Sequence, residues 1–231
     1  MKWQFRNRRD AGRLLAEQLS HYSTATNVTV LALPRGGVPV GYEVATVLRV
    51  PLGIFLVRKL GVPGHEEFAM GAIASGGLWF VNNDVVRQLE ISSQQIQRIV
   101  HREREELERR AEVYGSKFSE NDVRDQIVIL VDDGLATGST MRAAVNALKQ
   151  QQPERIIVAV PVASASTVEE LQNEVDEVVC LEMPEQFHAV GNWYEDFSQT
   201  TDEEVRELLE KARPTQPVPQ TFSSVFSEKT L

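Results

Sequence analysis

The chain has 231 residues, 42% of them hydrophobic, and a formal net charge of -9 at neutral pH. This length supports one sizeable α/β domain with its own core. The acidic balance argues against a broad electrostatic contact with nucleic acid or an anionic membrane, so neither is expected as a partner. No apolar run approaches the roughly 20 residues of a membrane-spanning helix, and the first residues, MKWQFRNRRDAG, lack the apolar stretch of a secretory signal. We therefore expect a cytoplasmic protein.

Apolar runs alternate with amphipathic stretches along most of the chain. This pattern predicts helices over residues 10–22, 38–48, 92–114, 141–149 and 167–174. It predicts strands over residues 28–33, 52–57, 78–81, 127–131, 156–162 and 178–181. Asp10 is expected to cap the first helix, and Pro161 to end its strand. The alternation indicates an α/β fold with a doubly wound parallel sheet, and such sheets bind ligands at the carboxyl ends of their strands.

Two further features concern the organisation of the chain. The single cysteine, Cys180, lies in an apolar run without a basic neighbour, so we expect a buried thiol and not a nucleophile. From about residue 213 the composition turns to Pro, Thr, Gln and Ser. We therefore expect one domain over residues 1–212 and a mobile tail over residues 213–231.

The most informative segment is IVILVDDGLATGST, residues 127–140. An apolar strand ends in two carboxylates, and a short hydroxyl-rich loop leads into a helix. Loop N–H groups and a helix N-terminus suit a phosphate, whereas the carboxylates suit the vicinal hydroxyls of a ribose. A sugar 5-phosphate presents both groups. The candidate binding residues are Asp132, Asp133, Gly134, Leu135, Ala136, Thr137, Gly138, Ser139 and Thr140.

Two rival motifs fail on details of this segment. A P-loop requires a Lys after its second Gly, but Ser139 follows Gly138. A receiver-type domain also ends a strand in two aspartates, but that strand opens its domain, and Asp132 lies past the middle of this chain. The segment resembles the 5-phosphoribosyl-1-diphosphate (PRPP) binding motif of the type I phosphoribosyltransferases, in which two acidic residues precede a Thr-Gly-small-Thr loop.

A second loop, Pro34-Arg35-Gly36-Gly37-Val38, follows the first predicted strand. Its glycines allow the backbone to approach an anion, and Arg35 adds a positive charge. Its spacing differs from the GxGxxG dinucleotide fingerprint, and alone the loop could be an ordinary turn. Beside the PRPP motif, Arg35, Gly36 and Gly37 resemble the diphosphate-binding loop of the same family.

The next strand ends in Arg58 and Lys59, followed by a stretch rich in Gly and polar residues without a settled period. Residues 58–77 resemble the flexible catalytic loop, or flap, that closes over PRPP in these enzymes. The resemblance implies that Arg58 and Lys59 neutralise the departing diphosphate. Glu66 and Glu67 are candidates for proton transfer, or else exposed surface carboxylates.

A cluster of aromatic residues lies between residues 183 and 200. The pattern resembles the hood of the hypoxanthine–guanine enzymes, and it implies that Phe187, Val190 and Trp193 hold a base; alternatively, these rings cap the core. Ala136, by contrast, stands where those enzymes carry a proton-transferring Asp, and is similar to the adenine and uracil transferases. The two features favour different subfamilies and leave the acceptor open.

The resemblance implies a PRPP-dependent transferase that joins a nitrogenous base to ribose 5-phosphate and releases diphosphate. It also implies Mg²⁺ on the diphosphate, with Asp132 and Asp133 contacting it at most through water, and a homodimer. The helix over residues 92–114 has more apolar positions than a solvated helix needs, which supports the dimer. The rival hypotheses are a non-catalytic regulator that senses PRPP or a nucleotide, and a degenerate module that binds PRPP without turnover.

Overall fold

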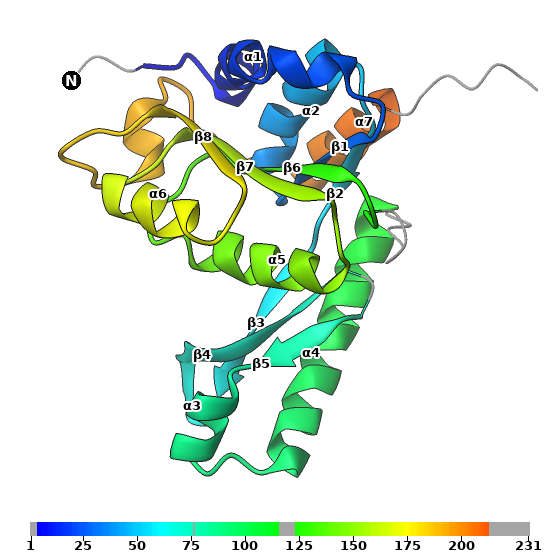
Figure 1. The fold of residues 1–231 in the computed structure, drawn as a ribbon, viewed down its shortest axis with the longest axis vertical. Coiled ribbons are helices and arrows are strands. Elements are labelled where there is room, and N and C mark those ends of the chain that lie inside the picture. The colour runs from blue at the N-terminus through cyan, green and yellow to red at the C-terminus, as the bar shows by residue number, and fades with distance from the viewer. Residues whose placement is uncertain (1–3, 76, 116–122, 213–231) are drawn as a thin grey trace, which may run out of the picture.

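The structure, a computed structural model, describes residues 4–75, 77–115 and 123–212, apart from the side chain of Glu67. The chain forms two parts (Figure 1): a five-stranded parallel sheet covered by helices on both faces, and a smaller part built on a three-stranded antiparallel sheet. We call them the sheet lobe and the hairpin lobe. The predicted tail over residues 213–231 lies outside the described residues.

The sheet lobe contains five parallel strands in the order β2-β1-β6-β7-β8. They are β1 (Val28–Ala32), β2 (Leu52–Ile54), β6 (Ile127–Val131), β7 (Arg155–Val162) and β8 (Glu177–Glu182). β1 lies between β2 and β6, with Val28 opposite Ile127 and Ala32 opposite Val131. The α/β class and the doubly wound parallel sheet predicted from the sequence are confirmed.

Helices cover both faces of this sheet because its strands are apolar on both sides. Val128 and Leu130 of β6 pack with α5 (Ser139–Gln150) and α6 (Ala165–Gln172). The alternate residues Ile129 and Val131 pack with α1 (Arg8–Gln18) and α2 (Gly37–Leu48) on the opposite face (Figure 1). α7 (Asp202–Lys211) lies against α2.

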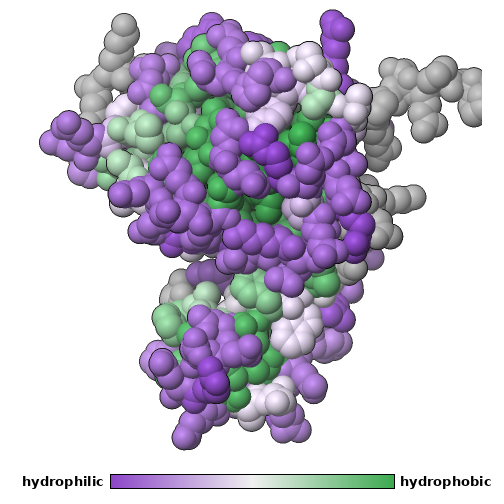
Figure 2. Space-filling view, in the orientation of Figure 1, coloured by the Kyte–Doolittle hydropathy of each residue, from purple (hydrophilic) through white to green (hydrophobic). Residues whose placement is uncertain are grey.

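The hairpin lobe holds the antiparallel sheet and the longest helix that the structure describes. Its elements are β3 (Val57–Val62), β4 (His65–Ala74), β5 (Trp79–Val81), α3 (Asn83–Gln88) and α4 (Ser93–Tyr114). Ile96, Val100 and Leu107 of α4 pack in one cluster with residues of β3, β4 and α7. The apolar positions of α4 therefore serve the interior of this chain, so they no longer support a dimer. Hydrophilic residues cover most of the face shown in Figure 2, and apolar residues gather in both lobes.

The largest difference from the sequence prediction lies in residues 61–77, where no regular element was expected. Most of this stretch is a β-hairpin, because its glycines serve close strand contact. A Cβ on Gly71 would lie 2.0 Å from the backbone oxygen of Phe80, and one on Gly61 2.5 Å from that of Glu66. Gly61 and Gly71, which suggested mobility, are therefore positions where neighbouring strands approach too closely for a side chain.

Smaller differences concern the ends of elements. Asn7, not Asp10, caps α1, and its side chain accepts a hydrogen bond from the Asp10 N–H. The strand predicted over residues 52–57 divides into β2 and the start of β3. Pro161 lies inside β7, where the pairing with β6 has already ended at Ala159 and the register with β8 passes from Val160 to Val162 without pairing Pro161. α3 and α7 were not predicted.

Within the described ranges, no helix combines the length and the apolar character that a membrane span requires. Cys180 is half-buried in β8, and burial raises the pKa of its thiol to about 11. The prediction of an unreactive structural cysteine agrees with this environment.

Candidate functional site

The acidic pair lies directly after β6, at the carboxyl end of the central strand. The backbone N–H of Asp133 donates to Asp132 Oδ1 at 2.8 Å, so both carboxylates are held in one turn. Asp133 Oδ2 accepts a hydrogen bond from Arg8 Nε at 2.8 Å, and the two side chains are only 15% and 11% exposed. The site therefore holds a shielded ion pair beside a second carboxylate.

Burial raises the pKa of Asp132 well above its ordinary value, and the charge of Asp133 raises it further. Burial also raises the pKa of Asp133, while the Arg8 guanidinium opposes that increase. Two carboxylates in one shielded turn are costly while both are ionised. A ligand that donates hydroxyl hydrogen bonds to the pair would relieve this cost, as predicted for ribose.

The loop after β1 packs directly against the acidic pair. A Cβ on Gly36 would lie 2.0 Å from Asp133 Oδ2, and one on Gly37 would lie 2.7 Å from the backbone oxygen of Val131. Gly37 therefore has no room for a side chain, and a side chain at position 36 would displace the Asp133 carboxylate. The structure thus brings together two motifs that are almost 100 residues apart in the sequence, as expected for neighbouring parallel strands.

The loop from Gly134 to Thr140 is fixed by the loop after β7. Leu135 donates from its N–H to the Val162 oxygen at 2.9 Å. The backbone oxygen of Ala136 accepts from Thr167 Oγ1 at 2.7 Å and from Ser164 Oγ at 3.3 Å. This leaves Thr137, Ser139 and Thr140 exposed at the start of α5, with Gly138 in the left-handed region at φ 66°. The hydroxyls and N-terminal N–H groups of α5 are thus positioned for a phosphate.

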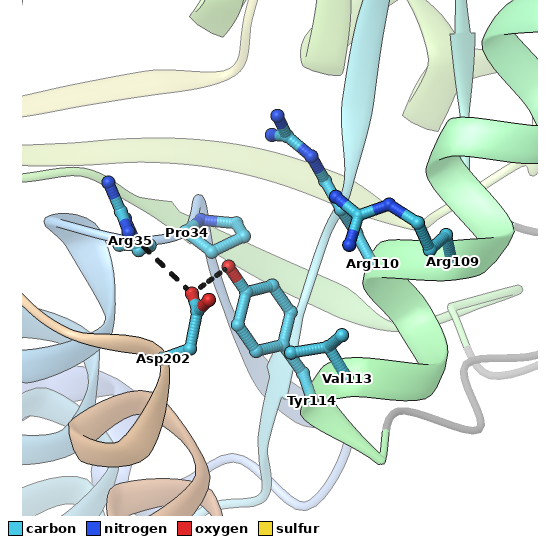
Figure 3. A pocket seen from close by; sticks show the side chains of 7 residues that line it. All are labelled: Pro34, Arg35, Arg109, Arg110, Val113, Tyr114 and Asp202. Carbon is cyan, nitrogen blue, oxygen red and sulfur yellow. Dashed lines mark hydrogen bonds and ion pairs between the residues drawn. The ribbon is translucent and has the colours of Figure 1, made fainter.

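Arg35 reaches from the same loop after β1 toward the hairpin lobe. Its Nη1 lies 3.8 Å from Asp202 Oδ1, and that carboxylate accepts a hydrogen bond from the Tyr114 hydroxyl at 2.9 Å. These residues line a cavity of about 420 Å³ together with Pro34, Val113 and two arginines of α4 (Figure 3). Burial and the bond to Asp202 raise the pKa of Tyr114 to about 12, so the phenol keeps its proton near neutral pH.

The predicted flap residues line a second cavity of about 320 Å³. Arg58, Lys59 and Glu66 share it with Thr140 of the PRPP-like loop. Arg58 Nε donates to Glu103 Oε2 of α4 at 2.6 Å, so this arginine is paired in the unliganded protein. Glu66 is exposed, whereas the side chain of Glu67 lies outside the described part of the chain.

The aromatic segment packs beside the acidic pair. Phe187, Val190 and Trp193 are half-buried against a cluster that includes Phe5 and Tyr194. A Cβ on Gly134 would lie 2.6 Å from Val190 Cγ1, which places this segment against the PRPP-like loop. Val190 is therefore close to the site, while all three residues pack against the core at this end of the sheet.

Sequence reasoning missed two residues that organise the site. The Tyr194 hydroxyl donates to the backbone oxygen of Asp133 at 2.6 Å. Arg8 lies over the Phe197 ring at 3.8 Å from its centroid, and its Nη1 donates to the Ser198 oxygen at 2.7 Å. Arg8 lies 125 positions from its acidic partner along the chain, and no local pattern distinguishes it from the neighbouring Arg6 and Arg9.

Comparison with known proteins identifies the class of this fold and site. Residues 5–196 match the phosphoribosyl transferase domain family, and the chain belongs to that family.

Relatives of known sequence and structure agree. Two proteins of Mycobacterium tuberculosis, from two different strains, are 41% identical over 208 residues, and their names propose phosphoribosyl transferase as their activity. The alignment covers 90% of this chain and 47% of each relative, so the chain spans about half the length of these proteins. The crystal structure of TT1426 from Thermus thermophilus superposes with a TM-score of 0.80 at 43% identity, and covers 90% of this chain and 98% of that one.

Proposed function

We propose that this chain is a PRPP-dependent phosphoribosyltransferase that transfers ribose 5-phosphate to a nitrogenous base and releases diphosphate. One observation carries the proposal. The acidic pair, the Gly36-Gly37 loop and the hydroxyl-rich start of α5 meet at the carboxyl ends of two adjacent strands. This arrangement suits a ribose, a diphosphate and a 5-phosphate of one ligand. The family membership of the domain, residues 5–196, supports the same reading.

The residues take separate roles in this proposal. Asp132 and Asp133 accept hydrogen bonds from the ribose hydroxyls, while the loop from Thr137 to Thr140 binds the 5-phosphate. Arg35, Gly36 and Gly37 bind the diphosphate. Holding PRPP beside the base in a reactive orientation lowers the entropic part of the barrier, and fixed positive charge stabilises the departing anion.

The hairpin β3–β4 acts as the flap. Its residues 58–77 would close over the bound sugar and exclude water. Arg58 would leave its ion pair with Glu103 and contact the diphosphate, and Lys59 would approach the same group. Glu66 or Glu67 would move a proton to or from the base. Hydrogen exchange in this hairpin should slow when PRPP binds. Equal exchange rates with and without PRPP would argue against a closing flap.

Magnesium fits this site only as an ion carried by the ligand. The described residues contain no group of three His, Cys, Asp or Glu side chains arranged to hold a metal. Asp133 is already paired with Arg8. Mg²⁺ would therefore be bound by diphosphate oxygens and water, as it commonly is with phosphate substrates, and Asp132 or Asp133 could reach it through water. When bound, it would neutralise charge on the leaving group.

The direct test is a screen of nucleobases with PRPP and Mg²⁺ that monitors diphosphate release. Release with one base establishes the transferase and names the acceptor. PRPP binding without release for any base would instead support the non-catalytic sensor or binding module. No binding of PRPP by calorimetry would overturn both readings.

The cytoplasmic location and the homodimer remain predictions. Light scattering at micromolar concentration should give twice the monomer mass, and the mass of one chain would contradict the dimer.

A further inference from the structure

The cavity of Figure 3 contains two arginines that no sequence motif identifies. Arg109 and Arg110 extend from the last turns of α4, across the cavity from Pro34 and Arg35. Three guanidinium groups thus line one cavity of about 420 Å³, with Asp202 as the acidic group among its lining residues. Several arginines around one cavity are suited to phosphate groups, because each planar guanidinium can donate two parallel hydrogen bonds to a phosphate.

Glu106 holds the two α4 arginines in position. It accepts from Arg109 Nε at 2.8 Å and Nη2 at 3.0 Å, and from Arg110 Nε at 2.9 Å. These hydrogen bonds, those from Arg109 foremost, lower the pKa of Glu106 to about 2, so it stays ionised and keeps both partners. Among the hydrogen bonds that the structure describes, those of Arg110 use only Nε, which leaves its two terminal nitrogens as donors for a ligand. Such prior positioning lowers the entropic cost of binding.

Arg110 also connects this cavity to the rest of the proposed site. Arg110 and Pro34 line both the large cavity and a small pocket of about 30 Å³ next to it. Thr140, Val57 and Arg58 line that small pocket and the flap cavity as well. The three cavities therefore lie next to one another, from Arg35 past Arg110 to Thr140 of α5 and the flap.

We propose that Arg109 and Arg110 of α4 form an anion site that receives the diphosphate end of the sugar substrate. This inference rests on the proposed function and adds a source of positive charge that does not depend on flap closure. The hairpin lobe would thus contribute to binding in two ways, through a flap that moves and through a helix end whose arginines are already placed. The site would recognise two adjacent phosphate groups, and both PRPP and free diphosphate carry such a pair.

The test is calorimetry at constant ionic strength with PRPP, inorganic diphosphate and ribose 5-phosphate as separate probes. The variants are Arg109→Gln, Arg110→Gln and their double. The control is Arg98→Gln, an exposed arginine on the same helix that lines none of the three hollows. Because the two cavity arginines are 62% and 44% exposed, their replacement should leave the fold intact, which the melting temperature checks.

The double variant should bind diphosphate and PRPP at least about tenfold more weakly, since hydrogen bonds to charged groups contribute at this level. It should bind ribose 5-phosphate as the wild type does, and Arg98→Gln should match the wild type with all three probes. Unchanged diphosphate affinity in the double variant, or an equal loss for ribose 5-phosphate, would overturn the inference.

The same titrations separate this inference from the proposed function. If the wild type binds diphosphate but not PRPP, and the double variant loses diphosphate, the anion site stands and the transferase does not. If the wild type binds PRPP and the double variant is unaffected, the transferase stands and the anion site does not. A wild type that binds neither probe would refute both.

Discussion

The two lobes differ in how their glycines are used, and the difference bears on which half of the proposed site is rigid and which is proposed to move. In the sheet lobe, Gly36 and Gly37 press against the acidic pair and the end of β6. In the hairpin lobe, Gly61 and Gly71 bring neighbouring strands together, but the turn at Gly64 faces open space, where a Cβ would have no atom within 4 Å. Close packing on the sheet side would fix the proposed ribose and phosphate sites, whereas the open space at Gly64 is consistent with the proposed movement of the hairpin.

The electrostatics of the lobes differ in the same way. The sheet lobe holds shielded carboxylates, with a single arginine, Arg8, opposite Asp133. Toward the hairpin lobe, the cavities are lined by arginines of α4 and β3, most of them paired with glutamates. A ligand with hydroxyls at one end and a diphosphate at the other would bridge the two lobes and match both.

Glycine substitutions test the contrast between the two lobes most directly. Gly37→Ala would place a Cβ 2.7 Å from the Val131 oxygen and 2.9 Å from the Asp132 Cα, both backbone atoms that cannot turn away. We expect a loss of about 2–3 kcal/mol of unfolding free energy, as for other overpacked positions, and weaker PRPP binding. Urea denaturation and calorimetry measure both effects.

Gly64→Ala is the matched change in the hairpin lobe. Its φ of 79° is unfavourable for alanine, but the space around it is open, so the loss should be smaller, about 1 kcal/mol. Equal losses at the two positions would mean that the lobes do not differ in the way argued above.

The sheet lobe was predictable because each of its signals is local. The five strands of its sheet follow from short apolar runs, and the acidic pair and the Thr-Gly-Ser-Thr loop follow one of those runs directly. The meeting of the Gly36-Gly37 loop with Asp133 then follows from the parallel order of the strands. Nothing beyond local pattern and a general rule of sheet topology was needed.

In the hairpin lobe, the helix over 92–114 and the strand over 78–81 were predicted and are found as α4 and β5, but the hairpin β3–β4 and the supports of the site were not predictable in this way. Residues 61–77 carry no alternation of apolar and polar side chains, and their pairing depends on glycine contacts between strands. Arg8, Tyr194 and Arg110 act through partners or hollows brought together only by the fold. Their sequence neighbourhoods resemble ordinary surface or core segments, so only the structure could identify them.

The next prediction asks whether the aromatic segment serves the ligand as well as the core. Phe187→Ala or Trp193→Ala should lower nucleotide affinity by on the order of 1–3 kcal/mol if the ring stacks on a base, and should leave PRPP affinity unchanged. His188→Ala is the control, because this histidine is exposed within the same segment. Calorimetry with nucleotides that the wild type binds decides the matter. If both ring variants keep full nucleotide affinity and only lose stability, the rings are core residues.

The last prediction concerns the two aspartates, which should respond differently to loss of charge. The folded-state pKa of Asp132 is raised, so the wild type loses stability as the pH rises from the ordinary aspartate pKa of about 3.9 through the raised value. Asp132→Asn removes this loss and should be more stable than the wild type near neutral pH, with the gain vanishing in acid. Its amide oxygen can still accept from the Asp133 N–H.

Asp133→Asn should give a smaller gain, because Arg8 already offsets part of the Asp133 charge and would lose its carboxylate partner. Both variants should bind PRPP more weakly, since an amide replaces one acceptor oxygen by a donor where the ribose hydroxyls are proposed to bind. Urea denaturation at acidic and neutral pH, with calorimetry on the same samples, measures the two properties together. A variant that gains stability while it loses PRPP affinity would show that the sheet lobe keeps a costly pair of charges for its ligand. If Asp132→Asn instead loses stability near neutral pH, the shielded pair is not under the repulsion inferred here, and the contrast between the two lobes would rest on glycine packing alone.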